Sequence, residues 1–155
     1  MISTRVKLER IALEPFVALV VQRGLTCAMG QGVGNRVALE GNVYFQFGDL
    51  RVDLPSRHLI VEVESAGGVT NLVKYWQCLD KGMIKKPVFL LHLFRQVSVN
   101  DYRSHIELWR FLAERMSQVL PGHFRAELYT YRADSLLSDL KPALDLFNDW
   151  LCDAT

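Results

Sequence analysis

The sequence predicts an α/β fold, with a mixed central β-sheet flanked by helices, and three observations lead to this fold class. Strand-like and helix-like patterns alternate through the second half of the chain. Residues 87–94 are almost all apolar, which is typical of a strand covered on both faces. Residues 48–64 have the pattern of a β-hairpin, because a β-prone run at residues 59–63 follows a turn-like Pro-Ser pair.

The first expected element is a helix at residues 11–23. Pro15 is tolerated near its first turn, and Gly24 is a suitable stop. A longer helix that begins near Thr4 and is kinked at Pro15 fits the same residues. The glycine-rich segment 30–35 is expected to be a loop, because no strand pattern leads into it and no helix pattern follows it.

Two short strands are expected next, at residues 37–39 and 43–47, on either side of the hairpin-type pair Gly41-Asn42. After the 48–64 hairpin, the remaining elements follow from periodicity alone. They are a helix at 70–83, a strand at 87–94, a helix at 101–119, a strand at 123–132 and a helix at 135–151. The residues of the 70–83 helix and its start that are expected to face the core are Val69, Leu72, Val73, Trp76 and Leu79.

Length and composition limit the class of protein. A chain of 155 residues, half of them hydrophobic, fits one globular domain, residues 1–155. The net charge of +1 counts against a protein that coats nucleic acid non-specifically, but not against a local basic groove. Three well-separated cysteines form no zinc or disulfide pattern, which favours a reducing, cytoplasmic setting. Charges interrupt the apolar runs, so neither a signal peptide nor a membrane span is expected.

Acidic residues lie on both arms of the 48–64 hairpin. With the turn at residues 55–56, Asp49 faces Glu62 across the two arms, whereas a slightly longer turn sets Asp49 opposite Glu64. In both registers carboxylates gather on one face, and like charges that face each other destabilise a sheet. A hard divalent cation, which prefers oxygen ligands, removes this conflict. The hairpin therefore predicts a small acidic metal site.

At these residues the chain resembles the PD-(D/E)XK nuclease superfamily, whose fold is called restriction-endonuclease-like. The order of a helix, a β-meander with acids, a helix and a buried strand is similar over residues 11–94. Gly48-Asp49 stands where the family has Pro-Asp, and the Glu-Val-Glu segment 62–64 stands where it has (D/E)-x-K. The resemblance implies a single nuclease-like domain with a restriction-endonuclease-like fold.

The resemblance also implies a metal-dependent endonuclease or exonuclease that hydrolyses phosphodiester bonds of nucleic acid, with DNA favoured. Asp49, Glu62 and Glu64 are then catalytic residues and ligands of Mg²⁺ or Mn²⁺. The lysine of the family motif is absent, because Glu64 occupies its position. Some members of the superfamily carry this lysine on the following helix, where the present chain has Lys74. Lys74 is therefore the fourth catalytic candidate, which positions the attacking water and offsets negative charge.

Three further residues are candidates for contacts with the substrate. Asn71 lies three residues before Lys74, so the two share one helical face. Tyr75 alternatively packs at the edge of the core, and Lys81 belongs to a lysine cluster that is alternatively a solvated helix end. A homodimer or a separate specificity subunit is compatible with the sequence, and no membrane partner is expected.

Several alternatives stay open. Lys74 is alternatively a solvated surface lysine, Asp53 is a solvated acid beside the turn or another metal ligand, and Glu14 is an ordinary acid of the first helix or an extra acid of the site. His92 is expected to be a core histidine with satisfied hydrogen bonds. The chain as a whole is alternatively a non-catalytic nuclease-fold module that binds nucleic acid or a protein partner, because the strand lysine is missing. A third reading is an unrelated α/β binding module whose acids decorate the surface.

Overall fold

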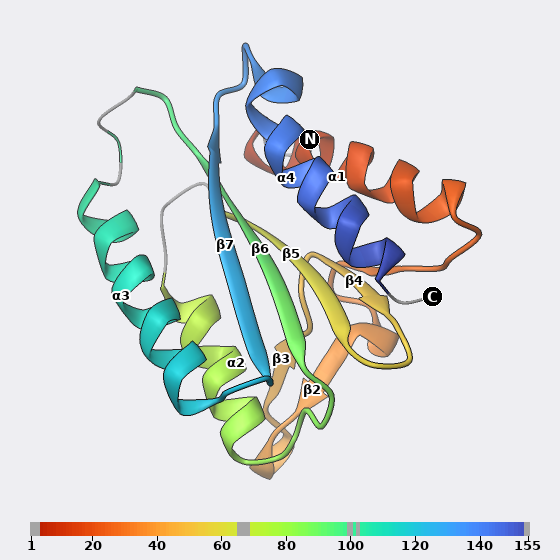
Figure 1. Ribbon diagram of the computed structural model, residues 1–155, viewed down its shortest axis with the longest axis vertical. Coiled ribbons are helices and arrows are strands. Elements are labelled where there is room, and N and C mark those ends of the chain that lie inside the picture. The colour runs from red at the N-terminus through yellow and green to blue at the C-terminus, as the bar shows by residue number, and fades with distance from the viewer. Residues whose placement is uncertain (1–3, 65–68, 99–100, 102, 154–155) are drawn as a thin grey trace.

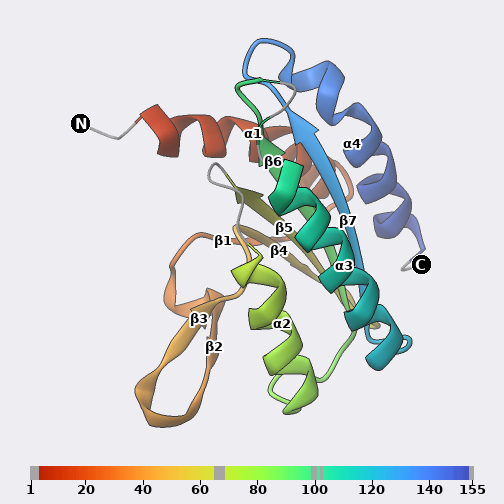
Figure 2. The same cartoon turned by 90° about the vertical axis from the view of Figure 1, so that its left-hand side faces the viewer.

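In the computed structural model, which describes residues 4–64, 69–98, 101 and 103–153, a five-stranded sheet lies between two layers of helices (Figure 1). The helices are α1 (Thr4–Gln22), α2 (Thr70–Asp80), α3 (Arg103–Val119) and α4 (Leu136–Cys152). The strands of the main sheet, in spatial order, are β1 (Ala28–Met29), β4 (Leu50–Asp53), β5 (His58–Glu64), β6 (Val88–Arg95) and β7 (Phe124–Tyr131). The strands β2 (Arg36–Ala38) and β3 (Tyr44–Gln46) form a separate ribbon that projects beside α2 (Figure 2).

The main sheet is mixed. β1, β4 and β5 pair antiparallel, whereas β5, β6 and β7 pair parallel. Parallel neighbours need crossover connections, and the helices α2 and α3 provide them on one face of the sheet (Figure 1). Helices α1 and α4 cover the other face. This arrangement confirms the predicted fold class, a mixed sheet flanked by helices.

Each face of the sheet has its own hydrophobic core. Strands β5 and β6 are buried along almost their whole length, which is characteristic of strands covered on both sides. Leu59, Val61 and Val63 of β5 enter the core under α1 and α4, whereas Ile60 enters the core under α2 and α3. Because side chains alternate along a strand, Glu62 points to the same side as Ile60, toward α2.

The helices begin and end close to their predicted bounds. α1 runs through Pro15, so the longer alternative that begins near Thr4 is the one observed. The prediction that Val73 lies on the buried face of α2 is wrong, since this side chain is half exposed. Tyr75 and Cys78 are buried on that face instead. No helix among the described residues combines the length and the apolar character that crossing a membrane requires.

The β2–β3 ribbon has one buried face and one exposed face. Gly41 and Asn42, with φ angles of 70° and 61°, lie in the connection between the two strands, as predicted, but this connection is the three-residue loop Glu40–Asn42, because Ala38 pairs with Tyr44 and the Leu39 amide donates to the Val43 carbonyl. Val37 and Phe45 belong to the core under α2 and α3. By alternation, the opposite face of the ribbon carries polar side chains toward solvent.

Candidate active site

Asp49 lies directly before β4, at the end of the hairpin where Glu62 lies on β5. The two strands pair from Leu50 with Val61 to Asp53 with His58, and Asp49 is the residue just outside this ladder. The Asp49 amide also donates a hydrogen bond of 3.1 Å to the Val61 carbonyl. The ladder has the register of the shorter turn, as predicted, and the charge of Asp49 acts on the Glu62 carboxyl, so the two acids lie near each other at this end of the hairpin.

Two donors fix the Asp49 carboxylate. Its Oδ2 accepts a hydrogen bond from the Val63 amide, and its Oδ1 accepts one from Nε2 of Gln46, each 2.8 Å long. Hydrogen bonds to an ionised carboxylate are stronger than neutral ones, so the side chain is held in place before any ligand arrives. Each oxygen keeps further lone-pair capacity, which leaves the carboxylate able to bind a cation.

Gly48 precedes Asp49 and has a backbone conformation that favours glycine. Its φ angle of 84° lies in the left-handed region that favours glycine. A Cβ atom at this position would lie 2.6 Å from Cγ2 of Ile60 and 3.5 Å from the Tyr75 hydroxyl. The missing side chain therefore allows both the positive φ angle and the close packing of Ile60 against this position.

Gly48→Ala is expected to lower the free energy of unfolding by about 2–4 kcal/mol, because an alanine there is strained at positive φ and overpacks Ile60. Gly32→Ala is the matched control, since Gly32 has a φ of −60° and open space around it. Urea unfolding of both variants measures the effect. Equal stability of the two variants would show that the backbone at Gly48 relaxes without cost.

The Glu62 carboxylate is buried against two donors from α2. Its Oε1 accepts hydrogen bonds from Lys74 Nζ and from the Tyr75 hydroxyl, each 2.6 Å long. Only 3% of the Glu62 side chain and 11% of the Lys74 side chain are exposed, so Lys74 is not a solvated surface lysine. Burial raises the pKa of Glu62 to about 7 against the opposing effect of Lys74, and the Asp49 charge raises it further.

The raised pKa of Glu62 predicts a pH-dependent stability for the metal-free protein. Between the ordinary pKa of 4.5 and the folded value of about 7, the folded chain holds a proton that the unfolded chain has released. The stability contributed by protonated Glu62 is therefore present below pH 4.5 and lost as the pH rises toward 7. This contribution to the free energy of unfolding is roughly 3 kcal/mol. The ionisable groups around the Glu62 carboxyl are Lys74, Tyr75, Asp49 and His92.

Urea unfolding of the wild type and of Glu62→Gln in EDTA, at a series of pH values across this range, measures the effect. The variant cannot titrate at this position, so the difference between the two profiles isolates Glu62 from His92. Burial lowers the pKa of His92 to about 3, and its contribution to stability changes with pH in the opposite direction. Parallel profiles for the two proteins would contradict the prediction.

Glu64 and His92 extend the polar cluster along the sheet. Glu64 Oε1 accepts a hydrogen bond of 2.6 Å from Asn71 Nδ2. His92 is fully buried, and its Nδ1 accepts a hydrogen bond of 2.8 Å from Trp109 Nε1, which leaves the proton of the neutral ring on Nε2. That Nε2 lies 4.0 Å from Glu64 Oε1 and has no hydrogen-bond partner among the described residues. His92 is thus satisfied at one nitrogen, where both were expected to be satisfied.

Tyr75 and Lys81, the other two residues predicted to contact the substrate, are placed differently from Asn71. Tyr75 is fully buried, so its ring packs in the core and its hydroxyl supports Glu62 from behind. Burial and the Glu62 charge raise the pKa of Tyr75, which keeps the hydroxyl protonated as a donor. Lys81 is exposed at the C-terminal end of α2, about 10 Å along the helix axis from Lys74. Among the predicted residues, the structure therefore brings together Asp49, Glu62, Glu64, Asn71, Lys74 and Tyr75.

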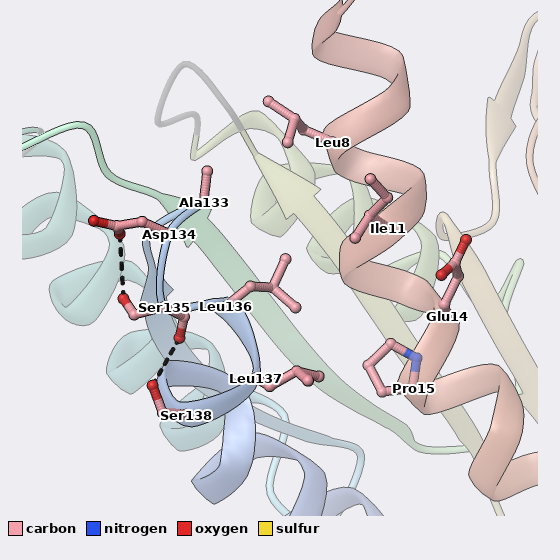
Figure 3. A pocket seen from close by; sticks show the side chains of 10 residues that line it. All are labelled: Leu8, Ile11, Glu14, Pro15, Ala133, Asp134, Ser135, Leu136, Leu137 and Ser138. Atoms are coloured by element: carbon pink, nitrogen blue, oxygen red, sulfur yellow. Dashed lines mark hydrogen bonds between the residues drawn. The ribbon is translucent and has the colours of Figure 1, made fainter.

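Two other acids considered from the sequence lie apart from this cluster. Asp53 is half exposed beside the hairpin turn and pairs with Arg51 Nε (3.2 Å) and His58 Nδ1 (2.6 Å). Glu14 lines a hollow of 650 Å³ between α1 and the start of α4, on the opposite face of the sheet from Glu62 (Figure 3). The walls of that hollow are largely aliphatic, with Ile11 and Leu137 pointing into it.

The carboxylate oxygens of the cluster are the type of ligand atom that a hard cation such as Mg²⁺ prefers. Among the described residues, no three His, Cys, Asp or Glu side chains gather closely enough to form a metal group. Mg²⁺, however, is often bound by only one or two carboxylates together with substrate phosphates and water. Asp49 and Glu62 offer two carboxylates on one face, and both hydrogen bonds to Glu62 end on Oε1, which leaves Oε2 for a ligand.

Comparison of the chain with protein-family models, curated proteins and solved structures finds no match. The functional assignment of the cluster therefore depends on the geometry of its own side chains.

Sequence reasoning missed two residues that hold the site together. Gln46 donates to Asp49 Oδ1 and, over 3.1 Å, to the Gly48 carbonyl. Asn35 is buried, and its Nδ2 donates to the carbonyls of Gly30 (2.8 Å) and Gly48 (2.9 Å), while its Oδ1 accepts from Arg51. The available signal was the placement of Asn35 at the end of a glycine-rich loop, because an asparagine there often caps exposed carbonyls and amides.

Proposed function

We propose that this chain is a metal-dependent nuclease with a restriction-endonuclease-like fold, which hydrolyses phosphodiester bonds of nucleic acid, with DNA favoured. The observation that carries the proposal is the contact between Lys74 and Glu62, with Asp49 directly before the facing strand. Lys74 is largely buried against a buried acid and beside a second acid, and burying charged groups costs desolvation free energy that an apolar cluster would avoid. The resemblance implied this combination, with the lysine moved from the strand to the helix.

The topology supports the same proposal. The order α1, an antiparallel β-meander, α2 and the parallel strand β6 is the order on which the resemblance rests. Asp49 stands at the start of the middle strand of the meander, and Glu62 and Glu64 stand near the end of its last strand. The acids therefore meet toward one end of these central strands, beside the first turns of α2.

Each side chain has a defined task in this proposal. Asp49 and Glu62 would hold Mg²⁺ or Mn²⁺, which supplies an activated water and neutralises charge on the phosphate. Lys74 contributes a positive charge where negative charge develops, and it orients the attacking water. Tyr75 holds Glu62 from the core side, and Gln46 holds Asp49. Because both hydrogen bonds are already formed, the two carboxylates need not change position during the reaction.

Glu64 has a supporting task. Asn71 holds its carboxylate at one side, and the His92 Nε2 atom lies 4.0 Å from the same oxygen. Such a carboxylate can accept a proton from water or contribute to a second cation.

A second candidate function is a non-catalytic nuclease-fold module that binds nucleic acid or a protein partner. The observation that favours it is the closed contact at Glu62, where Lys74 and Tyr75 both donate to the same oxygen. An acid neutralised in this way is a stable structural element even when it has no catalytic task.

Metal-dependent cleavage separates the two candidates. Purified protein is incubated with labelled single-stranded and duplex DNA and RNA in Mg²⁺, in Mn²⁺ and in EDTA. The nuclease proposal expects cleavage of at least one substrate in the metals and none in EDTA. Binding without cleavage in any metal would select the non-catalytic module.

A further inference from the structure

A small hollow lies on the exposed face of the β2–β3 ribbon, next to the Asp49 carboxylate. Arg36 and Gln46 are directly paired across the ribbon, and Tyr44 lies two residues before Gln46, so the three side chains share this face. With Gln31 from the preceding loop, they line a hollow of 250 Å³. The opposite face of the ribbon is anchored in the core, which holds the hollow in a fixed position relative to the sheet.

The walls of the hollow offer flat surfaces to a ligand. The Tyr44 side chain is half exposed, and the Arg36 guanidinium lies 5.8 Å from the centroid of its ring. Arg36 Nη2 also donates a hydrogen bond of 3.3 Å to the Gln31 carbonyl, which restrains the guanidinium. An exposed aromatic ring beside a planar cation is the pair of surfaces on which an unstacked base packs.

Gln46 connects the hollow to the proposed catalytic carboxylate. Both hydrogens of its amide are used, on Asp49 Oδ1 and on the Gly48 carbonyl, so Oε1 is its remaining hydrogen-bonding atom. That oxygen can accept a hydrogen bond from the amino group of a base. A ligand that bonds to Gln46 in the hollow is therefore separated from the Asp49 carboxylate only by the Gln46 side chain.

Cationic side chains continue from the hollow along the protein surface. Arg36 also lines a neighbouring hollow of 460 Å³, together with the exposed Lys85 and with Arg51, whose largely buried guanidinium is held by Asn35 and the Gly34 carbonyl. Asp53 lies in the same hollow and is paired with Arg51 and His58, so it offsets part of this charge. Lysine and arginine side chains in such a position contact phosphates and set the register of a strand without reading its sequence.

We propose that the hollow of Gln31, Arg36, Tyr44 and Gln46 binds an unpaired nucleobase, and that the chain acts on single-stranded or locally unpaired nucleic acid. The binding part stands on the ribbon alone, whereas the cleavage part rests on the proposed nuclease function. A base stacked inside a duplex has no free face to offer Tyr44, and a net charge of +1 gives little affinity for duplex phosphates as such. DNA and RNA share the required chemistry, a base flanked by phosphates.

The test is fluorescence anisotropy in EDTA, so that binding is measured without cleavage. The probes are labelled oligonucleotides of about 10 nucleotides, single-stranded DNA, single-stranded RNA and a duplex of the same DNA sequence. Tyr44→Ala and Arg36→Ala should each weaken single-strand binding by about tenfold or more, and Tyr44→Phe should retain it. Phe111→Ala and Arg115→Ala, at exposed positions of α3, are the matched controls and should bind as the wild type does. Thermal unfolding of each variant verifies that it is folded.

The outcomes are distinguishable from those for the nuclease proposal. Single-strand affinity that falls in Tyr44→Ala and Arg36→Ala supports the inference, whether DNA or RNA binds more tightly. Unchanged affinity in Tyr44→Ala, equal affinity for the duplex, or no binding of single strands would overturn it, even if the wild type cleaves duplex DNA. Tyr44-dependent binding without cleavage in any metal leaves the inference standing and overturns the nuclease function.

Discussion

Asp49→Asn and Glu62→Gln are each expected to lower kcat/KM for metal-dependent cleavage by roughly two to four orders of magnitude. Each substitution keeps the size of the side chain but removes the charge that would hold a divalent cation. The fold should survive both changes. The amide oxygen of the first variant would still accept from the Val63 amide, and that of the second would still accept from the Tyr75 hydroxyl.

The measurement is initial cleavage rate against substrate and metal concentration. Asp145→Asn and Glu107→Gln are matched controls, because both acids are exposed and lie on α4 and α3, away from the cluster. A loss of activity that excess Mn²⁺ partly restores would point to weakened metal binding. Full cleavage by Asp49→Asn would rule out its assigned role.

Lys74→Ala is expected to lower kcat by about three orders of magnitude, with a much smaller change in nucleic-acid affinity. The reason is the loss of a positive charge that acts chiefly in the transition state. Lys74→Arg should rescue poorly, because a planar guanidinium cannot replace a compact ammonium held 2.6 Å from Glu62 Oε1. Stability should fall by only about 1–3 kcal/mol, since the carboxyl left behind can take up a proton.

Single-turnover cleavage, anisotropy and urea unfolding of both variants separate these effects. Lys141→Ala is the control, because Lys141 is exposed on α4 and pairs with Asp145 on the helix surface. A large loss of stability with little change in kcat would assign Lys74 a structural task. Unchanged cleavage by Lys74→Ala would place the catalytic cation elsewhere or exclude one.

The register of the acids was predictable because it depends on local features. One turn-like pair at residues 55–56 and the two-residue period of a strand were enough to fix the register of the hairpin, which brings Asp49 and Glu62 to the same end of it. Lys74 was a candidate because the resemblance implied a lysine on the following helix, and helical spacing put it on one face with Asn71, away from the apolar stripe of α2. The register needed only neighbours across one hairpin, whereas the lysine needed the resemblance.

The supports of the site were not predictable in the same way. Tyr75 was placed at the edge of the core, but it is buried because Glu62 gives its hydroxyl an acceptor inside the protein. The buried face of α2 therefore includes Tyr75 where apolarity alone favoured Val73. Asn35 and Gln46 act on carbonyls and a carboxylate brought near by the fold of the ribbon, and no periodic pattern marks such contacts.

The side chains assigned to catalysis all come from residues 49–74, one continuous stretch of the chain. Short loops close at little entropic cost, so we expect the β4–β5 hairpin and α2 to meet before the distant strand β7 and helix α4 have joined the sheet. Glu62 then meets Lys74 and Tyr75 as soon as α2 docks on the hairpin, whereas His92, its neighbour across the parallel pair, arrives only with β6. We therefore expect a newly synthesised chain to assemble the acids and the lysine from one local segment, before the parallel half of the sheet is complete.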